Sequence, residues 1–352
     1  MTTAGPSPVP VLGAALGGPA SLAFAVSGPS HVGEVRRRAH ALGVAAGLGE
    51  TELGTLAVIV TEAATNLARH ATDGFILLRL VGTSPAAVEV LALDKGPGIR
   101  DLTKAMSDGY STAGTAGHGL GAIRRMATEY DVYSAAETGT ALFARVHASQ
   151  RSMNGEADPG TSGVVCLPMG TERDCGDAWL IDRTAQRALV VLADGLGHGP
   201  DAARAADAAI RTAQQHARHS PARIIEAAHD AMRATRGAAL AVAEVVPSEK
   251  RLTFAGIGNI AGVIVSQDGT KSLASLNGIA GHEMRTVREF VYPWDGQACL
   301  IMHSDGIKSR WQLEAYPGLA ARHPALIAGI LFRDFTRRRD DATVLAVRMR
   351  ER

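Results

Sequence analysis

Three short motifs follow one another in the first half of the chain: Glu62-Ala-Ala-Thr-Asn66, Asp94-Lys-Gly-Pro-Gly98 and Gly117-His-Gly-Leu-Gly121. The first provides a carboxylate and an amide one helical turn apart, so both side chains project from one helix face. The second places a carboxylate after an apolar stretch and before a glycine turn. The third provides glycines at the start of a helix, where free amides favour a polyphosphate. In this order, the motifs predict an ATP site that holds the phosphates with a metal ion and backbone amides.

Each motif has its own expected task in such a site. Asn66 is expected to offer its carbonyl oxygen to Mg²⁺, and Glu62 to orient or deprotonate a nucleophile. Asp94 is suited to accept a hydrogen bond from the exocyclic amine of adenine. Taken alone, a polar pair four residues apart is an ordinary solvated helix face, and Asp94 is an ordinary turn residue. The predicted nucleotide contacts are Asn66, Asp94, Gly96, Gly98, Gly117, Gly119, Leu120 and Gly121.

The three motifs resemble the N, G1 and G2 boxes of the GHKL ATPases. Together with Gly109-Tyr-Ser-Thr112 and Gly119-Leu-Gly-Ala-Ile-Arg-Arg-Met126, they resemble more specifically the RsbT-like switch kinases, which are serine/threonine kinases of the anti-sigma-factor type. The resemblance covers about residues 20–147 and implies that Glu62 is the catalytic base, with residues 104–116 as a mobile lid over ATP. No phosphoacceptor histidine is expected, because the chain leaves no room for the dimerisation domain of a histidine kinase.

Four aspartates in the second half of the chain, Asp177, Asp194, Asp305 and Asp340, lie at or near the ends of apolar stretches. Clustered carboxylates repel one another unless cations or protons intervene, so their convergence would imply bound Mg²⁺ or Mn²⁺. Two such ions can activate water for attack on a phosphoester. Gly195 would add its backbone carbonyl as a further ligand. Each aspartate alone is an ordinary turn residue, but the set in this order favours the metal site.

This second half resembles the PPM-type serine/threonine phosphatases of the SpoIIE-like branch, across about residues 163–349. The matching pieces are Gly176-Asp177, Ala193-Asp-Gly-Leu-Gly-His-Gly199, Gly256-Ile-Gly-Asn259, His303-Ser-Asp-Gly306 and Asp340-Asp-Ala-Thr-Val344. The resemblance implies that Asp194 bridges two ions and that Asp177 and Gly195 complete the shell of one of them. Asp305 and Asp340 would hold the other ion, with Asp341 as the alternative to Asp340.

The composition divides the chain into two α/β (α+β) domains. Residues 149–162 are polar and rich in Gly, Ser and Asp, which predicts a linker between a first domain at 21–148 and a second at 163–352. Residues 1–20 are expected to be flexible because of their Pro and Gly content. For the first domain we expect a GHKL (Bergerat) α/β sandwich, with helices on one face of a mixed sheet. For the strand-rich second domain we expect an α-β-β-α sandwich of two packed sheets.

Charge and cysteine content exclude several other classes. With 36 Lys and Arg against 35 Asp and Glu, the chain has no charge excess to attract nucleic acid or an anionic membrane. The N-terminus lacks the basic region of a signal peptide and no stretch predicts a membrane span, so a cytoplasmic protein is expected. Cys166, Cys175 and Cys299 lack paired spacing, which predicts reduced, largely buried thiols.

Together, the two resemblances predict a bifunctional partner-switching regulator of bacterial stress or sigma-factor signalling. The first domain would use ATP and Mg²⁺ to phosphorylate a STAS-domain antagonist or stressosome-type protein, and the second would use two Mn²⁺ or Mg²⁺ to remove phosphate from Ser or Thr. One alternative is that the first domain only binds a regulator in a nucleotide-dependent way and gates an active phosphatase. Another is that one half is inactive and regulates the other.

Overall fold

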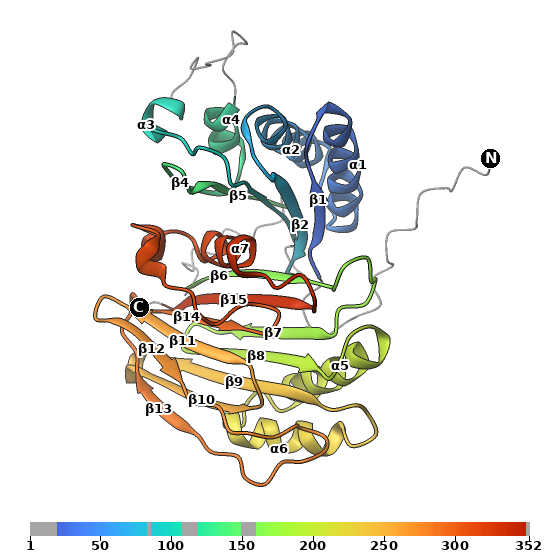
Figure 1. Ribbon diagram of the computed structural model, residues 1–352, viewed down its shortest axis with the longest axis vertical. Coiled ribbons are helices and arrows are strands. Elements are labelled where there is room, and N and C mark those ends of the chain that lie inside the picture. The colour runs from blue at the N-terminus through green and yellow to red at the C-terminus, as the bar shows by residue number, and fades with distance from the viewer. Residues whose placement is uncertain (1–19, 83–85, 107–118, 149–159, 350–352) are drawn as a thin grey trace, which may run out of the picture.

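The computed structural model describes residues 20–82, 86–106, 119–148 and 160–349. These residues form three five-stranded sheets with helices around and between them (Figure 1). Nearly all of the predicted flexible N-terminus and most of the predicted lid and linker lie outside the described residues. Strand β6 begins at Gly160 and so takes up residues 160–162, which the sequence assigned to the linker. None of the described helices is long and apolar enough to cross a membrane.

The first sheet has the strand order β1-β2-β3-β5-β4. Its strands are β1 (Leu22–Ala25), β2 (Phe75–Val81), β3 (Ala87–Leu93), β5 (Gly139–His147) and β4 (Glu129–Ala135). Every pairing in it is antiparallel, so the expectation of a mixed sheet is wrong. The reason lies in the β1–β2 connection, which contains two helices. After β1, the two helices bring the chain back to the same end of the sheet, so β2 runs antiparallel to β1. A parallel pairing would need a crossover to the opposite end.

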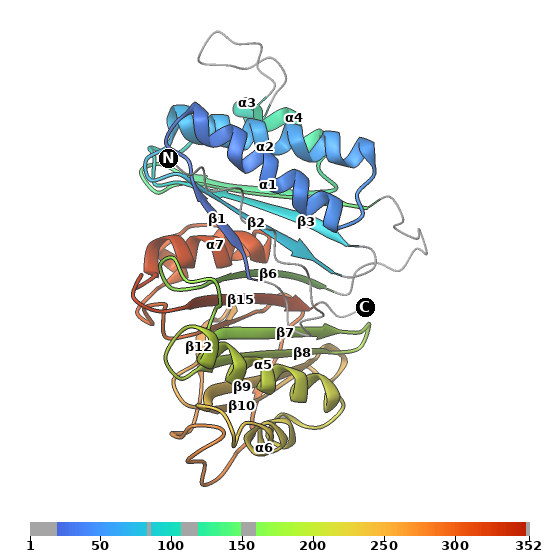
Figure 2. The ribbon, with the colours of Figure 1, turned by 90° about the vertical axis from the view of Figure 1, so that its right-hand side faces the viewer.

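One face of this sheet is covered by helices, as expected (Figure 2). They are α1 (Pro29–Ala45), α2 (Glu50–His70) and α4 (Gly119–Met126), with the short α3 (Leu102–Ala105) nearby. Side chains alternate across a strand, so Ile76 and Leu78 join the core below these helices, while Leu77 joins a different core on the opposite face. The sheet is therefore buried on both faces.

The second domain is the expected α-β-β-α sandwich. One sheet contains β7 (Asp177–Arg183), β8 (Ala188–Gly195), β9 (Ala238–Val246), β10 (Arg251–Ile257) and β13 (Phe290–Pro293). The other contains β6 (Gly160–Leu167), β15 (Ala342–Met349), β14 (Cys299–His303), β11 (Ala261–Ser266) and β12 (Gly269–Leu273). Helices α5 (Pro200–Gln215) and α6 (Pro221–Ala231) cover the outer face of the first of these sheets, and α7 (Pro324–Phe335) covers that of the second.

Helix α7 joins the two domains, and the sequence analysis did not predict it. It lies between the sheet of the first domain and strands β6 and β15 of the second (Figures 1 and 2). A side chain at Gly329 would put its Cβ 2.7 Å from Leu91 Cδ2, so the glycine lets helix and sheet approach closely. Leu326 and Ile330 are fully buried in a core that contains residues of both domains. Residues Pro324–Phe332 are all apolar or glycine, so the helix is apolar on every side. Such a helix is typically buried on every side.

A chain of charged side chains is also buried beside this interface. Glu89 accepts hydrogen bonds from Arg79 at 2.8 Å and from Arg145 at 2.6 Å. The two guanidinium groups hold the pKa of Glu89 below its ordinary value, although burial alone would raise it. Arg79 also stacks over the ring of Trp179, 5.3 Å from its centroid, and Trp179 belongs to β7 of the second domain. The ionic groups thus contribute to the junction of the two domains.

Candidate active sites

The first candidate site begins on α2, where Glu62 and Asn66 are half-buried one turn apart. Helix α4 begins at Gly119, and a Cβ at that position would lie 3.8 Å from Asn66 Nδ2. The described part of the third motif therefore meets the first motif, with Leu120 half-buried and Gly121 buried in the first turn of α4. Gly117 and the segment Gly109–Thr112 lie outside the described residues.

Asp94 follows β3 and is 9% exposed. Its Oδ1 accepts a hydrogen bond from the Gly96 amide at 2.7 Å, which orients the carboxylate. Burial raises the pKa of Asp94, and the Gly96 amide opposes that rise. Gly98 has a φ of 73°, and a Cβ there would lie 2.2 Å from the carbonyl oxygen of Ala135, so only glycine fits. The second motif is thus a compact turn around an oriented, buried carboxylate, as an adenine contact requires.

The second candidate site forms at the ends of β7 and β8, where Asp177 pairs directly with Asp194. Ser304 donates a hydrogen bond from its Oγ to Asp177 Oδ2 at 2.7 Å, whereas the buried Asp177 Oδ1 has no partner. Burial raises the pKa of Asp177 well above its ordinary value. An unpaired buried carboxylate oxygen is costly, and a cation would compensate it.

The remaining aspartates surround Asp194. Burial, followed by the charges of Asp177, Asp305 and Asp340, raises the pKa of Asp194 to about 9. Asp305 accepts a hydrogen bond from Asn259 Nδ2 at 2.7 Å, and burial and then Asp340 raise its pKa as well. Asp177, Asp305 and Asp340 are therefore near enough for their charges to act on Asp194, and such repulsion between carboxylates fits a site for divalent cations.

Gly195, the predicted carbonyl ligand, is fixed by its surroundings. Its amide donates to the carbonyl oxygen of Gly176 at 3.0 Å, and a Cβ at Gly195 would lie 2.1 Å from the carbonyl oxygen of Ala202 in α5. Within the described parts of the chain, no three His, Cys, Asp or Glu side chains are gathered closely enough to hold a metal ion by themselves. An ion here would therefore need water and the Gly195 carbonyl as further ligands, which suits Mg²⁺ and Mn²⁺.

The adjacent residues Asp340 and Asp341 have different surroundings. Asp341 is 3% exposed and accepts hydrogen bonds from the amides of Met169 and Gly176, both at 2.8 Å. Both of its oxygens are thus used to hold the loop before Asp177. Asp340 is half-buried, and its charge acts on Asp194 and Asp305. The geometry favours Asp340 as the ligand and gives Asp341 a supporting position that the sequence did not reveal.

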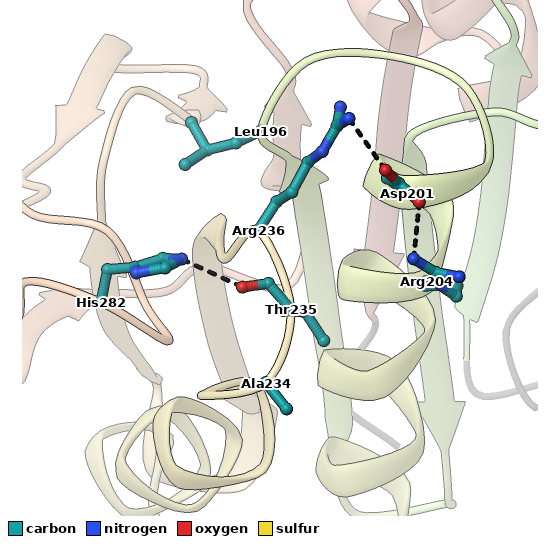
Figure 3. A pocket seen from close by; sticks show the side chains of 7 residues that line it. All are labelled: Leu196, Asp201, Arg204, Ala234, Thr235, Arg236 and His282. Atoms are coloured by element: carbon teal, nitrogen blue, oxygen red, sulfur yellow. Dashed lines mark hydrogen bonds and ion pairs between the residues drawn. The ribbon is translucent and has the colours of Figure 1, made fainter.

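A pocket of about 450 Å³ lies beside the loop that follows Asp194 (Figure 3). Arg236 and Arg204 both contact the carboxylate of Asp201 on its rim, at 2.8 and 2.6 Å. The Arg236 guanidinium lies beside Gly197, because a Cβ there would be 3.3 Å from its Nη1. The lining residues are Leu196, Asp201, Arg204, Ala234, Thr235, Arg236 and His282. The pocket, which no sequence motif indicated, puts positive charge next to the metal-site loop.

Two relatives match different halves of the chain. The family profile of the histidine kinase-like ATPase domain matches residues 26–146, and that of Stage II sporulation protein E (SpoIIE) matches residues 184–350. The serine/threonine-protein kinase RsbT of Bacillus subtilis (strain 168) is 33% identical over 99 residues, which are 28% of this chain and 74% of that protein. The phosphoserine phosphatase RsbX of the same organism is 22% identical over 134 residues, which are 38% of this chain and 67% of that protein.

One solved structure is similar to about half of this chain. A chain from work on the bacterial stressosome, a modular system adapted to control secondary messenger signalling, has a TM-score of 0.52 and 27% identity to this chain. The match covers 54% of this chain and all of the other. The two family profiles show that a kinase-like ATPase domain and a phosphatase domain are present together in one polypeptide.

Proposed function

Because the chain belongs through its first half to the family of the serine/threonine kinase RsbT, and carries a SpoIIE-type serine/threonine phosphatase domain in its second, we propose that it is a bifunctional partner-switching regulator. The first domain phosphorylates Ser or Thr of a STAS-domain antagonist or stressosome-type protein, and the second hydrolyses the phosphoester on the same protein or a related one. The observation that carries this proposal is the pair of separate constellations, one around Asn66 and Asp94 and one around Asp194. Linkage raises the effective concentration of each activity at a shared substrate.

In the kinase half, the residues position the reactants. Asp94 accepts a hydrogen bond from adenine, and the amides at the start of α4 hold the phosphates beside Asn66. Bound Mg²⁺, held by the Asn66 carbonyl, supplies neutralisation of phosphate charge. Glu62 accepts the proton of the substrate hydroxyl as the phosphoryl group is transferred.

In the phosphatase half, Asp177, Asp194, Asp305, Asp340 and the Gly195 carbonyl hold the metal ions. When bound, these ions lower the pKa of water and stabilise the charge on the phosphoryl group. Ser304 keeps the Asp177 carboxylate in place by its hydrogen bond at 2.7 Å. The Asp194 carboxylate, which burial protonates at neutral pH in the absence of a cation, has to release this proton when the ions bind.

The pocket in Figure 3 supports a phosphoprotein substrate with acidic residues near the phosphorylated one. Two guanidinium groups share the single carboxylate of Asp201, which leaves net positive charge beside the metal-site loop. We expect Arg236→Ala to raise the KM for a phosphoprotein while hydrolysis of a small aryl phosphate keeps its rate. Arg223→Ala is the matched control, because Arg223 is an exposed arginine of α6 with its own ion pair to Glu226.

The kinase assignment is tested by mixing the protein with Mg-ATP and an unphosphorylated STAS-domain protein. Transfer of phosphate is expected, and Glu62→Ala should abolish transfer while it spares nucleotide binding. Equal loss of transfer and binding would contradict the role of Glu62 as base. A stable, nucleotide-dependent complex with no phosphate on the partner would instead identify the first domain as a binding module.

The phosphatase assignment is tested on a phosphoserine peptide with Mn²⁺. Asp194→Asn is expected to abolish the metal-dependent hydrolysis, and retained activity would move the site elsewhere. Asp340→Asn and Asp341→Asn separate the two adjacent carboxylates. We expect the first substitution to reduce apparent Mn²⁺ affinity more than the second, and the reverse order would make Asp341 the ligand.

A second candidate function, gating of the phosphatase by nucleotide, is favoured by the contacts of α7. Arg333 of α7 is 4% exposed, and its Nη1 donates a hydrogen bond to the carbonyl oxygen of Asp94. Lys95 also forms an ion pair with Asp334 at 3.6 Å. At the end of α7, the amide of Arg337 donates to the carbonyl oxygen of Gly306, next to Asp305, at 2.8 Å. Helix α7 and the two residues after it therefore connect the predicted adenine motif with the loop that contains Asp305.

Such coupling would prevent wasteful cycling of ATP, because both activities act on one substrate. Binding of a non-hydrolysable ATP analogue is expected to change the phosphatase rate of the wild-type protein. Arg333→Met keeps the aliphatic stem and removes the hydrogen bond, so it should reduce the nucleotide effect without removing nucleotide binding. A phosphatase rate that is indifferent to saturating nucleotide would refute the gating.

A further inference from the structure

Two of the three cysteines lie close together beside the candidate metal site. The Sγ atoms of Cys166 and Cys175 are 3.6 Å apart, and both thiols are free. The sequence predicts largely buried thiols, but it offers no sign that these two lie close together. A disulfide would need the sulfur atoms to approach by about 1.5 Å, to the usual bond length of about 2.05 Å.

The two cysteines sit in different environments. Cys166 is 2% exposed in β6, at the edge of one sheet, and its carbonyl oxygen accepts a hydrogen bond from the Ser21 amide at 2.7 Å. Cys175 is half-buried in the loop before β7, which is the edge strand of the facing sheet. Cys175 is therefore the more accessible of the two thiols, and it lies in a loop, whereas Cys166 lies in a strand.

We propose that Cys166 and Cys175 form a peroxide-sensitive dithiol whose oxidation to a disulfide weakens the metal site. The sulfur of one of the two cysteines attacks a hydroperoxide, the O–O bond breaks, and a sulfenic acid forms with release of an alcohol or water. The sulfur of the other cysteine then attacks this sulfur, the S–S bond forms and water leaves. In total, two thiols lose two electrons and two protons, and one peroxide bond is reduced. A dithiol reductant reverses the reaction.

The effect on the metal site follows from the residues next to Cys175. The Gly176 amide donates to Asp341 Oδ2 at 2.8 Å, and the Gly176 carbonyl oxygen accepts from the Gly195 amide at 3.0 Å. Asp177 follows directly. Movement of Cys175 toward Cys166 therefore displaces the segment that carries Asp177 and contacts Asp341 and Gly195. Loss of such supporting contacts commonly reduces metal affinity by about 10- to 100-fold.

The modification is tested first without any activity assay. The full-length protein is treated with hydrogen peroxide, and peptides are analysed by mass spectrometry without reduction. A linked Cys166–Cys175 peptide is expected in the wild-type protein and in Cys299→Ser, whose substituted thiol is buried in β14. The link should be absent from Cys166→Ser and Cys175→Ser. Sulfinic or sulfonic acid on Cys175 without a link, or a link to Cys299, would overturn the proposal.

The consequence for the metal site rests on the proposed phosphatase function, so it has a separate readout. Oxidation is expected to reduce the apparent Mn²⁺ affinity by about tenfold or more. This affinity is measured from the thermal shift that Mn²⁺ induces. Phosphopeptide hydrolysis at limiting Mn²⁺ should fall in parallel and return after reduction. A complete disulfide with unchanged Mn²⁺ affinity would refute the weakening. If the reduced protein shows no hydrolysis, the proposed function fails, while the disulfide and the Mn²⁺ shift still decide this inference.

Discussion

Asp194→Asn is expected to stabilise the metal-free protein although it removes the proposed central ligand of the metal site. In the folded protein, burial and three neighbouring aspartates raise the pKa of Asp194 from 3.8 to about 9. An acid with a raised pKa binds its proton more tightly in the folded state. Its contribution to the free energy of unfolding is therefore present below pH 3.8 and is lost as the pH rises toward 9.

The magnitude follows from the distance between the pH and the unfolded pKa. At pH 7 the difference is about three units, and each unit corresponds to about 1.36 kcal/mol, which makes up to about 4 kcal/mol. Asparagine has nearly the same shape and does not ionise. In a chelator, the variant should therefore exceed the wild type by little at pH 4 and by up to about 4 kcal/mol at pH 7. For a domain of this size, each kcal/mol raises Tm by about 2–4 °C.

Thermal and urea unfolding in chelator at several pH values measure this difference. With Mn²⁺ present the order should reverse, because only the wild type gains stability from the ion. Asp182→Asn is a suitable control, since Asp182 is an exposed aspartate at the other end of β7. A variant that is less stable than the wild type in chelator at pH 8, or a difference that does not grow with pH, would refute the reasoning.

Three further substitutions test the fold around the sites. Glu89→Gln leaves two buried guanidinium groups without their carboxylate and should cost about 3–5 kcal/mol at pH 7 by urea unfolding. Its deficit should shrink as the pH falls below 4.5, because the Glu89 carboxyl of the unfolded wild type then takes up a proton while the folded one, with its lowered pKa, still stays charged. A deficit that does not change with pH would speak against the ion pairs. Gly98→Ala should abolish binding of an ATP analogue, whereas Gly47→Ala, with a similar φ of 71° and no atom within 4 Å of the added Cβ, should retain it. Gly329→Val overfills the junction of α7 with the first domain and should cost about 1–3 kcal/mol, seen as a lower Tm, and an unchanged Tm would mean that the junction is loose.

Local spacing carries much of the information about the two sites. Glu62 and Asn66 share a helix face because of the helical repeat, and Gly98 is required by a positive φ and a close carbonyl. The four aspartates could be assigned to one predicted site from the sequence, because each lies at or near one end of an apolar stretch that predicts a strand. In such cases a short window of residues contains the physical cause.

Other features depend on segments that are distant in the chain. The sequence favoured Asp340 only by resemblance, whereas the structure shows that Asp341 is occupied by the amides of Met169 and Gly176. Cys166 and Cys175 are only nine positions apart, but their contact also depends on tertiary structure, because it forms where the edges of two packed sheets meet.

The sequence by itself identified a kinase-like ATPase domain and a phosphatase domain, because each motif is local and its residue types indicate a chemistry. Only the tertiary structure decided how the two domains are joined. Helix α7 is buried between their sheets, and its Arg333 contacts the carbonyl oxygen of Asp94, 239 positions earlier. Such a contact depends on the packing of two sheets against one helix, which no local pattern of residues specifies.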